Sequence, residues 1–149
     1  KSGKSDGEKY SMDEIPGCNA IHGYALSIHL EFEADDLDAR NWVVDFGGLR
    51  ELKYKLEEMF DHTLLLAEDD PEFDTIMELH EKALAKVMVV EKTGCEGLAD
   101  FIYNFINGKG GYLELLGYDD RVWCCRVEVR ETDSNMAMRL GHREDGDLD

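Results

Sequence analysis

A strict alternation of apolar and polar residues near the start of the chain constrains the fold more than any other feature. The apolar positions are Tyr24, Leu26, Ile28, Leu30 and Phe32. Successive side chains of a strand point to opposite faces, so this pattern predicts a strand with one buried face. The chain must therefore build a sheet whose apolar side is covered by other elements.

Helical and strand-like stretches follow this strand. Apolar residues at helical spacing predict helices over 46–60, 71–86 and 98–106, and Asp45 is placed to cap the first of them. Shorter runs predict strands over 87–91 and 121–131. In the last strand, one face is expected to carry Trp123, Cys125, Val127, Val129 and Glu131. This order, which contains no repeat, favours an α+β fold with helices packed on one face of an antiparallel sheet.

The chain is expected to form one domain between polar ends, because 149 residues suffice for one core but not for two ordinary ones. Residues 1–17 are polar, carry three glycines and predict a loop or arm. Residues 18–132 form the predicted domain, with an elaborated helical connection around 69–86. Residues 133–149 lack apolar periodicity and predict a flexible acidic tail.

The charge of the chain excludes several classes of partner. There are 34 Asp and Glu against 16 Lys and Arg, which gives a net charge of −18. Such a chain repels phosphate backbones and anionic membranes, so neither nucleic acid nor membrane is expected as a partner. The four cysteines show no CxxC spacing, which argues against a disulfide framework or a cysteine zinc site and favours a cytoplasmic location.

Titratable side chains gather in three short segments at the ends of predicted elements. These segments are 18–24 (CNAIHGY), 60–62 (FDH) and 127–132 (VEVRET). A cysteine acts as a base or nucleophile when its thiolate is stabilised, and a histidine oriented by a carboxylate is the usual partner for proton transfer. Cys18 with Asp61 and His62 would supply that combination.

These segments, with VVDFGGL at 43–49 and TGCEGLA at 93–99, resemble the 6-pyruvoyltetrahydropterin synthase and 6-carboxytetrahydropterin synthase family. The five segments occur in the family's order. The resemblance implies the tunnelling fold, in which the sheets of several subunits assemble into a barrel. It also implies a homo-oligomer, either a trimer or a hexamer.

The resemblance further assigns roles to individual residues. Cys18, Asp61 and His62 would be catalytic and would move protons. Glu131 would bind the pterin ring, since two carboxylate oxygens accept hydrogen bonds from adjacent ring N–H and amino donors. Glu96, at the start of the helix beside the pterin pocket, and Thr132 would complete the substrate site.

Zinc is the cofactor that the resemblance implies. The family holds it with three histidines, of which His22 matches one, while Tyr24 occupies the second ligand position. The third histidine is expected on a strand upstream of the given sequence. Alternation points His29 to the opposite face, His80 is expected to pack in the core, and His142 lies in the predicted tail.

The implied function is a lyase that converts 7,8-dihydroneopterin triphosphate with loss of triphosphate. The spacing of Cys18 and His22 is more similar to the 6-carboxytetrahydropterin synthase branch, which feeds queuosine and deazaguanine synthesis. Arg126 and Arg130 are candidates to offset the triphosphate charge. The alternatives are 6-pyruvoyltetrahydropterin synthase activity, a related enzyme with another substrate or metal, or a zinc-deficient pterin-binding paralogue.

Overall fold

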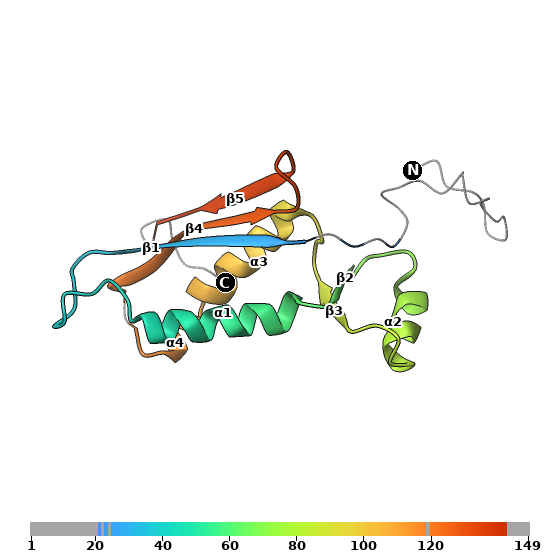
Figure 1. Cartoon of the computed structure of the whole chain (residues 1–149), viewed down its shortest axis with the longest axis horizontal. Coiled ribbons are helices and arrows are strands. Elements are labelled where there is room, and N and C mark those ends of the chain that lie inside the picture. Colours follow the sequence, from blue (N-terminus) through green and yellow to red (C-terminus); the bar gives the residue numbers. More distant parts are fainter. Residues whose placement is uncertain (1–20, 22, 24, 119, 143–149) are drawn as a thin grey trace.

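A three-stranded antiparallel sheet carries its main helices on one face (Figure 1). The computed structural model describes residues 21, 23, 25–118 and 120–142. The sheet order is β1 (Ser27–Ala34), β4 (Val122–Arg130) and β5 (Met136–Leu140). The helices α1 (Phe46–Phe60) and α3 (Cys95–Asn107) lie on the same side of it. The predicted α+β class, with an antiparallel sheet and helices, is therefore confirmed.

A second, smaller unit extends beyond the end of α1 (Figure 1). The strands β2 (Leu64–Ala67) and β3 (Val87–Val90) pair in parallel, and α2 (Phe73–Glu81) connects them. The short helix α4 (Tyr112–Leu115) follows α3. The sequence pattern predicted α2 and β3 but missed β2. Within the described residues, no helix has the length and apolar character needed to cross a bilayer.

The start of α1 has the predicted cap. The Asp45 side chain accepts a hydrogen bond from the Gly47 amide at 2.8 Å, which satisfies one of the free N–H groups of the first turn. The Tyr118 hydroxyl also accepts from the Asp45 amide at 2.9 Å. These bonds fix the start of α1, whose residues Leu52 and Leu56 are buried against the core.

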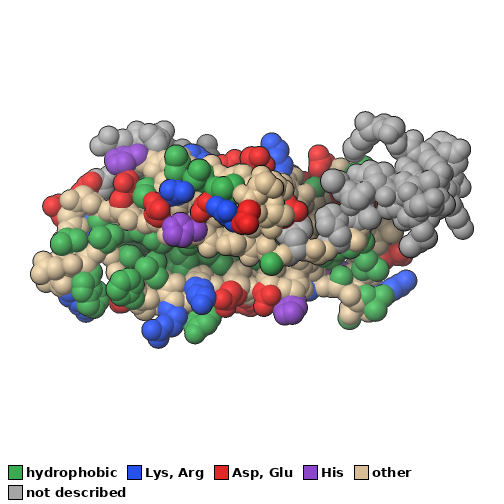
Figure 2. Space-filling model, turned by 45° about the horizontal axis from the view of Figure 1, so that its top comes forward, with side chains coloured by type: hydrophobic (Ala, Val, Ile, Leu, Met, Phe, Trp, Pro, Cys, Tyr) green, Lys and Arg blue, Asp and Glu red, His purple; other side chains and the backbone are tan. Residues whose placement is uncertain are grey.

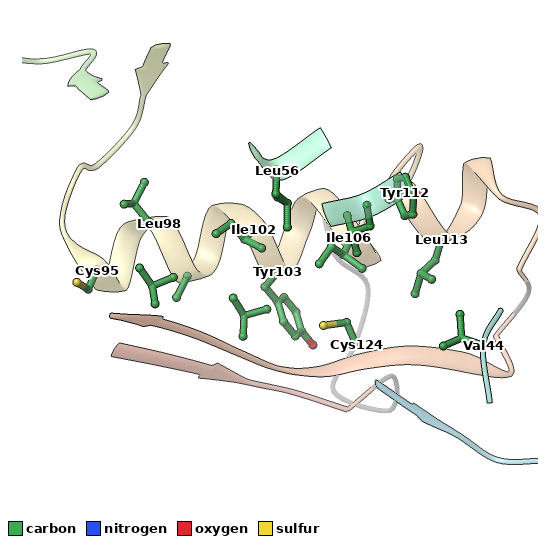
Figure 3. Packing of buried hydrophobic residues seen from close by; sticks show 14 of the residues in the cluster. Val44, Leu56, Cys95, Leu98, Ile102, Tyr103, Ile106, Tyr112, Leu113 and Cys124 are labelled. Carbon is green, nitrogen blue, oxygen red and sulfur yellow. The ribbon is translucent and has the colours of Figure 1, made fainter. Parts of the chain in front are cut away.

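Helix α3 supplies much of the hydrophobic core (Figure 3). Leu98, Ile102 and Ile106 recur at intervals of four and are fully buried. They pack in one cluster with the buried side chains of β4, among them Cys124. Burial raises the pKa of Cys124 to about 12, so this thiol stays neutral and serves as a core residue.

A bulge in β4 changes which side chains face the core. Glu31 lies opposite Arg126, but the next residue of β1, Phe32, lies opposite Cys124, which leaves Cys125 as an extra residue. Cys124 is therefore fully buried and Cys125 is not. The prediction that Trp123 and Cys125 share a face with Val127 and Val129 is wrong, because the extra residue shifts the alternation by one.

The predicted tail contains a strand. Met136–Leu140 form β5 and pair with β4 from Arg126↔Leu140 to Arg130↔Met136. The prediction of a flexible tail is wrong for this segment, because pairing with β4 stabilises a run too short to show periodicity by itself. Residues 143–149 and the arm predicted over 1–17 lie outside the described residues.

Candidate functional site

Glu131 follows directly after β4 and is held by the turn that leads to β5. Its Oε2 accepts a hydrogen bond from the Asn135 side-chain amide at 2.6 Å, and its backbone amide donates to the Asn135 carbonyl at 3.0 Å. Thr132 belongs to the same turn, where its Oγ1 accepts from the Asn135 amide at 3.0 Å. The sequence-predicted pair Glu131 and Thr132 thus occupies one rigid turn, with Glu131 half-buried and Thr132 exposed.

The first turn of α3 lies beside this turn. The buried Cys95 thiol is 3.9 Å from the Asn135 carbonyl oxygen, and Glu96 follows it on the exposed side of the helix. Burial raises the pKa of the Cys95 thiol, and the nearby charges of Glu131 and Glu96 raise it further. Two of the predicted substrate carboxylates therefore lie around one neutral thiol.

Sequence reasoning missed Cys95. Its signal was available, because it directly precedes Glu96 at the start of a predicted helix. Because the Cys95 thiol stays protonated, it adds no negative charge beside the carboxylates. It also provides a weak hydrogen-bond donor among the acceptors of this cluster.

Asp61 and His62 form the second group of predicted residues. Asp61 ends α1, where its amide donates to the Glu57 carbonyl at 2.7 Å. His62 has φ of 51°, a left-handed conformation that turns the chain sharply after the helix. Its Nε2 lies 3.7 Å from an Asp61 carboxylate oxygen, and both side chains are mostly exposed, 93% for His62 and 69% for Asp61. The predicted carboxylate–imidazole pair is therefore present and open to a substrate.

An apolar groove of about 1330 Å³ runs between β1 and α1 and reaches this pair. Figure 2 shows hydrophobic side chains gathered between the charged sheet surface and the charged side of α1. Leu26, just before β1, lines the groove, together with the β1 and α1 residues Ile28, Leu30, Phe32, Leu49, Leu52, Leu56 and Phe60. Asp61 and His62 line it as well, and so do Ile21 and Gly23.

Three predicted residues of the first motif, Cys18, His22 and Tyr24, lie outside the described residues. Their predicted roles therefore stay predictions. The described positions within the motif, Ile21 and Gly23, line the same groove as Asp61 and His62.

The structure keeps the two groups of described site residues apart. Glu131, Glu96 and Thr132 do not line the groove that contains Asp61 and His62. No hydrogen bond or ion pair joins the two groups within the described part of the chain. Both groups lie toward the same end of the three-stranded sheet, where β1 begins and α1 ends (Figure 1).

The arginines predicted to offset a triphosphate are engaged elsewhere. Arg126 lies 3.7 Å from Glu31, and Arg130 lies 3.0 Å from Glu128 and 3.7 Å from Asp133. The hydrogen bond from Arg130 lowers the pKa of Glu128 and keeps that carboxyl ionised. Neither arginine lines the groove.

The described histidines do not build a metal centre. In the parts of the chain that the structure describes, no group of three or more His, Cys, Asp or Glu residues is placed to hold a metal ion. His29 lies 3.4 Å from Glu31, and His142 lies 3.3 Å from Glu33. His80, predicted to pack in the core, is exposed instead, and its Nδ1 accepts a hydrogen bond from the amide that starts β3.

The chain also matches a known protein family over most of its length. The family model described as 6-pyruvoyl tetrahydropterin synthase matches residues 7–141 of the chain.

Three relatives named 6-carboxy-5,6,7,8-tetrahydropterin synthase illustrate the similarity. The chain is 28% identical to the protein of Aquifex aeolicus over 122 aligned residues. This alignment covers 80% of this chain and 74% of the relative. The chain is 29% identical over 115 residues to that of Bacillus subtilis, covering 77% and 64%. With the protein of Rickettsia conorii it shares 36% over 56 residues, covering 37% and 41%. The matches thus span 41% to 74% of the length of these relatives.

The fold also has a match among solved structures. The crystal structure of an uncharacterized protein from Wolinella succinogenes aligns with a TM-score of 0.67 at 21% identity, over 91% of this chain and 89% of the other. At this identity the match supports the fold alone.

Proposed function

Because the chain belongs to the 6-pyruvoyl tetrahydropterin synthase family, we propose that it is a pterin lyase that resembles 6-carboxytetrahydropterin synthase in its reaction. Its substrate would be 7,8-dihydroneopterin triphosphate, which loses triphosphate. The names of the relatives from Aquifex aeolicus and Bacillus subtilis support this branch. The observation that carries the proposal is that one chain holds both a positioned carboxylate, Glu131, and an exposed Asp61–His62 pair.

Glu131 is suited to bind the pterin ring. A carboxylate has two oxygens with about four acceptor sites, and the bond from Asn135 uses one of them. Both oxygens therefore retain a free acceptor site for the adjacent ring N–H and amino donors of a pterin. The Asn135 bond also fixes the rotation of the carboxylate, which reduces the entropy lost when the ring binds.

The Asp61–His62 pair is suited to proton transfer. A carboxylate beside an imidazole orients the ring and stabilises its protonated form. In the proposed elimination, His62 accepts a proton from a side-chain carbon of the substrate, the adjacent C–O bond breaks, and triphosphate leaves with the bonding electrons. Cys18 is the proposed second proton-transfer residue.

The proposed enzyme works as a homo-oligomer, either a trimer or a hexamer, whose sheets form a barrel. Two observations support assembly. β1 and β5 are the edge strands of the described sheet, and free edges favour pairing with another chain. The groove of about 1330 Å³ also exceeds the roughly 300–1,000 Å³ of ordinary ligand pockets, which leaves room for a neighbouring subunit. The carboxylate of one subunit would then face the Asp61–His62 pair of another.

Zinc belongs to the proposal only through His22, the ligand that the resemblance implies. The described residues add no cluster of ligands to it. No step above is therefore assigned to a metal. Elemental analysis of the purified protein and of the His22→Ala variant measures zinc directly, and equal zinc in both proteins would exclude His22 as a ligand.

The proposed function is tested by incubating the full-length protein with 7,8-dihydroneopterin triphosphate and measuring triphosphate release and the pterin product. We expect 7,8-dihydroneopterin triphosphate and water to give 6-carboxytetrahydropterin, the intermediate of deazaguanine and queuosine synthesis, together with triphosphate and acetaldehyde, which carries away the other two side-chain carbons. A 6-pyruvoyl product would support the other branch of the family instead. Pterin binding without triphosphate release would refute the lyase and favour a pterin-binding paralogue.

A further inference from the structure

Lys86 forms hydrogen bonds on both sides of the turn that contains Asp61 and His62. Its backbone carbonyl accepts a hydrogen bond from the Leu64 amide at 2.8 Å, just after the turn. Its side-chain ammonium donates to the Glu58 carbonyl in the last turn of α1, just before it. The residue just before β3 is thereby bonded to the last turn of α1, and Figure 1 shows the β2–β3 pair next to the end of that helix.

The ammonium of Lys86 has no carboxylate partner among the described residues. Of these residues, two of the Lys and Arg type line the groove, Lys53 and Lys86. Lys53 lies 3.8 Å from Glu57 on the same helix. Within the described residues, the hydrogen-bond partner of Lys86 is the neutral Glu58 carbonyl and no carboxylate lies within ion-pair distance of it. Its charge is thus available to an anion in a chain whose net charge is −18.

The Lys86 ammonium offsets negative charge at the end of α1. The carboxyl end of α1 carries a partial negative charge, and Asp61 adds a full one, so a polyanion approaching His62 is repelled. A lysine ammonium is a compact charge that proteins commonly use to bind phosphate. We propose that the Lys86 ammonium binds the polyphosphate group of the substrate beside Asp61 and His62. This assignment rests on the proposed function and replaces the predicted candidates Arg126 and Arg130.

Binding of inorganic triphosphate to the assembled full-length protein tests the assignment without requiring turnover. The variants are Lys86→Gln and Lys86→Arg, and Lys55→Gln is the matched control. Lys55 lies on the exposed side of α1, outside the groove, so the control changes the net charge equally. Isothermal titration calorimetry measures affinity, and thermal unfolding of each variant shows whether loss of the Glu58 bond has weakened the fold.

We expect Lys86→Gln to weaken triphosphate binding about tenfold or more, as is typical for loss of a hydrogen bond to a charged group. Lys86→Arg should keep most of the affinity and Lys55→Gln nearly all of it. If Lys86→Gln, folded at the assay temperature, binds triphosphate as tightly as Lys55→Gln, the assignment is wrong. The protein could bind triphosphate in a Lys86-dependent way and yet release no triphosphate from the pterin substrate. That result would uphold the anion site and refute the lyase.

Turnover measurements distinguish a role of Lys86 in binding the polyphosphate from a role in binding the pterin ring. Where the lyase is active, Lys86→Gln should raise KM for the triphosphate substrate while the affinity for unphosphorylated dihydroneopterin stays unchanged. A loss of affinity for both compounds would contradict a role restricted to the polyphosphate.

Discussion

Replacing Glu131 by Gln tests the pterin-binding role directly. The substitution keeps the shape of the side chain but exchanges one acceptor oxygen for an N–H₂ donor, which would face a donor of the pterin ring. One charged hydrogen bond is lost, worth about 1.5–3 kcal/mol, which corresponds to about a tenfold to 150-fold loss of affinity. Glu131 is only half-buried and its turn keeps the backbone bond to Asn135, so the fold should be little affected.

Glu128→Gln is the matched control for this experiment. Glu128 lies on β4, three residues before Glu131, carries the same charge and is bonded to Arg130 at 3.0 Å rather than to a site residue. Calorimetry with dihydroneopterin, which lacks the phosphates, isolates binding of the ring. Equal affinity in the Glu131→Gln variant and the wild-type protein would remove Glu131 from the pterin site, and equal losses in both variants would attribute the effect to net charge.

Three further predictions concern the chemistry and the stability of the fold. Cys18→Ala should abolish triphosphate release at an unchanged melting temperature, and near-full activity would remove Cys18 from the proton-transfer set. Ile102→Ala should lower the free energy of unfolding in urea by about 2–5 kcal/mol, because Ile102 is fully buried and its loss leaves a cavity; a loss well below 1 kcal/mol would contradict this packing. The melting temperature should rise with added sodium chloride, because salt screens the self-repulsion of a chain with a net charge of −18, and a flat or falling dependence would show that this repulsion does not limit stability.

Most of the elements that the sequence predicted have a long internal pattern, and the four-residue β3 was predicted from its β-branched residues instead. The alternation through Ile28 and Leu30 predicted β1, and the spacing that ends at Phe60, with the Asp45 cap, predicted α1. The strands β2 and β5 have only four and five residues, so their stability depends on partners that the local sequence does not reveal. The bulge at Cys125 was hidden for the same reason, because it is defined by the register with β1.

Among the candidate site residues, the sequence suggested those within the family's motifs but not Lys86. The resemblance proposed Glu131, Glu96, Asp61 and His62 as site residues, and the structure adds the hydrogen bond to the Glu131 carboxylate and the left-handed backbone conformation of His62. It did not identify Lys86, because nothing in a run of small and apolar residues indicates that this side chain reaches α1 from 28 positions away. A contact between distant segments leaves no periodic trace in the sequence, so residues positioned in this way are recognised only after folding.

Glu131 and the Asp61–His62 pair are positioned by different elements of the fold. Glu131 is fixed by the β4–β5 turn, whereas His62 is fixed by the end of α1, and no described bond links them. Sites without shared partners change free energies nearly additively, whereas contacting residues couple. In separated subunits, loss of the Glu131 charge should therefore weaken ring binding to the same degree whether or not His62 is present. In the proposed oligomer the two groups face each other across the subunit boundary, so coupling between Glu131 and His62 variants is expected there, and purely additive effects in the assembled protein would contradict that arrangement.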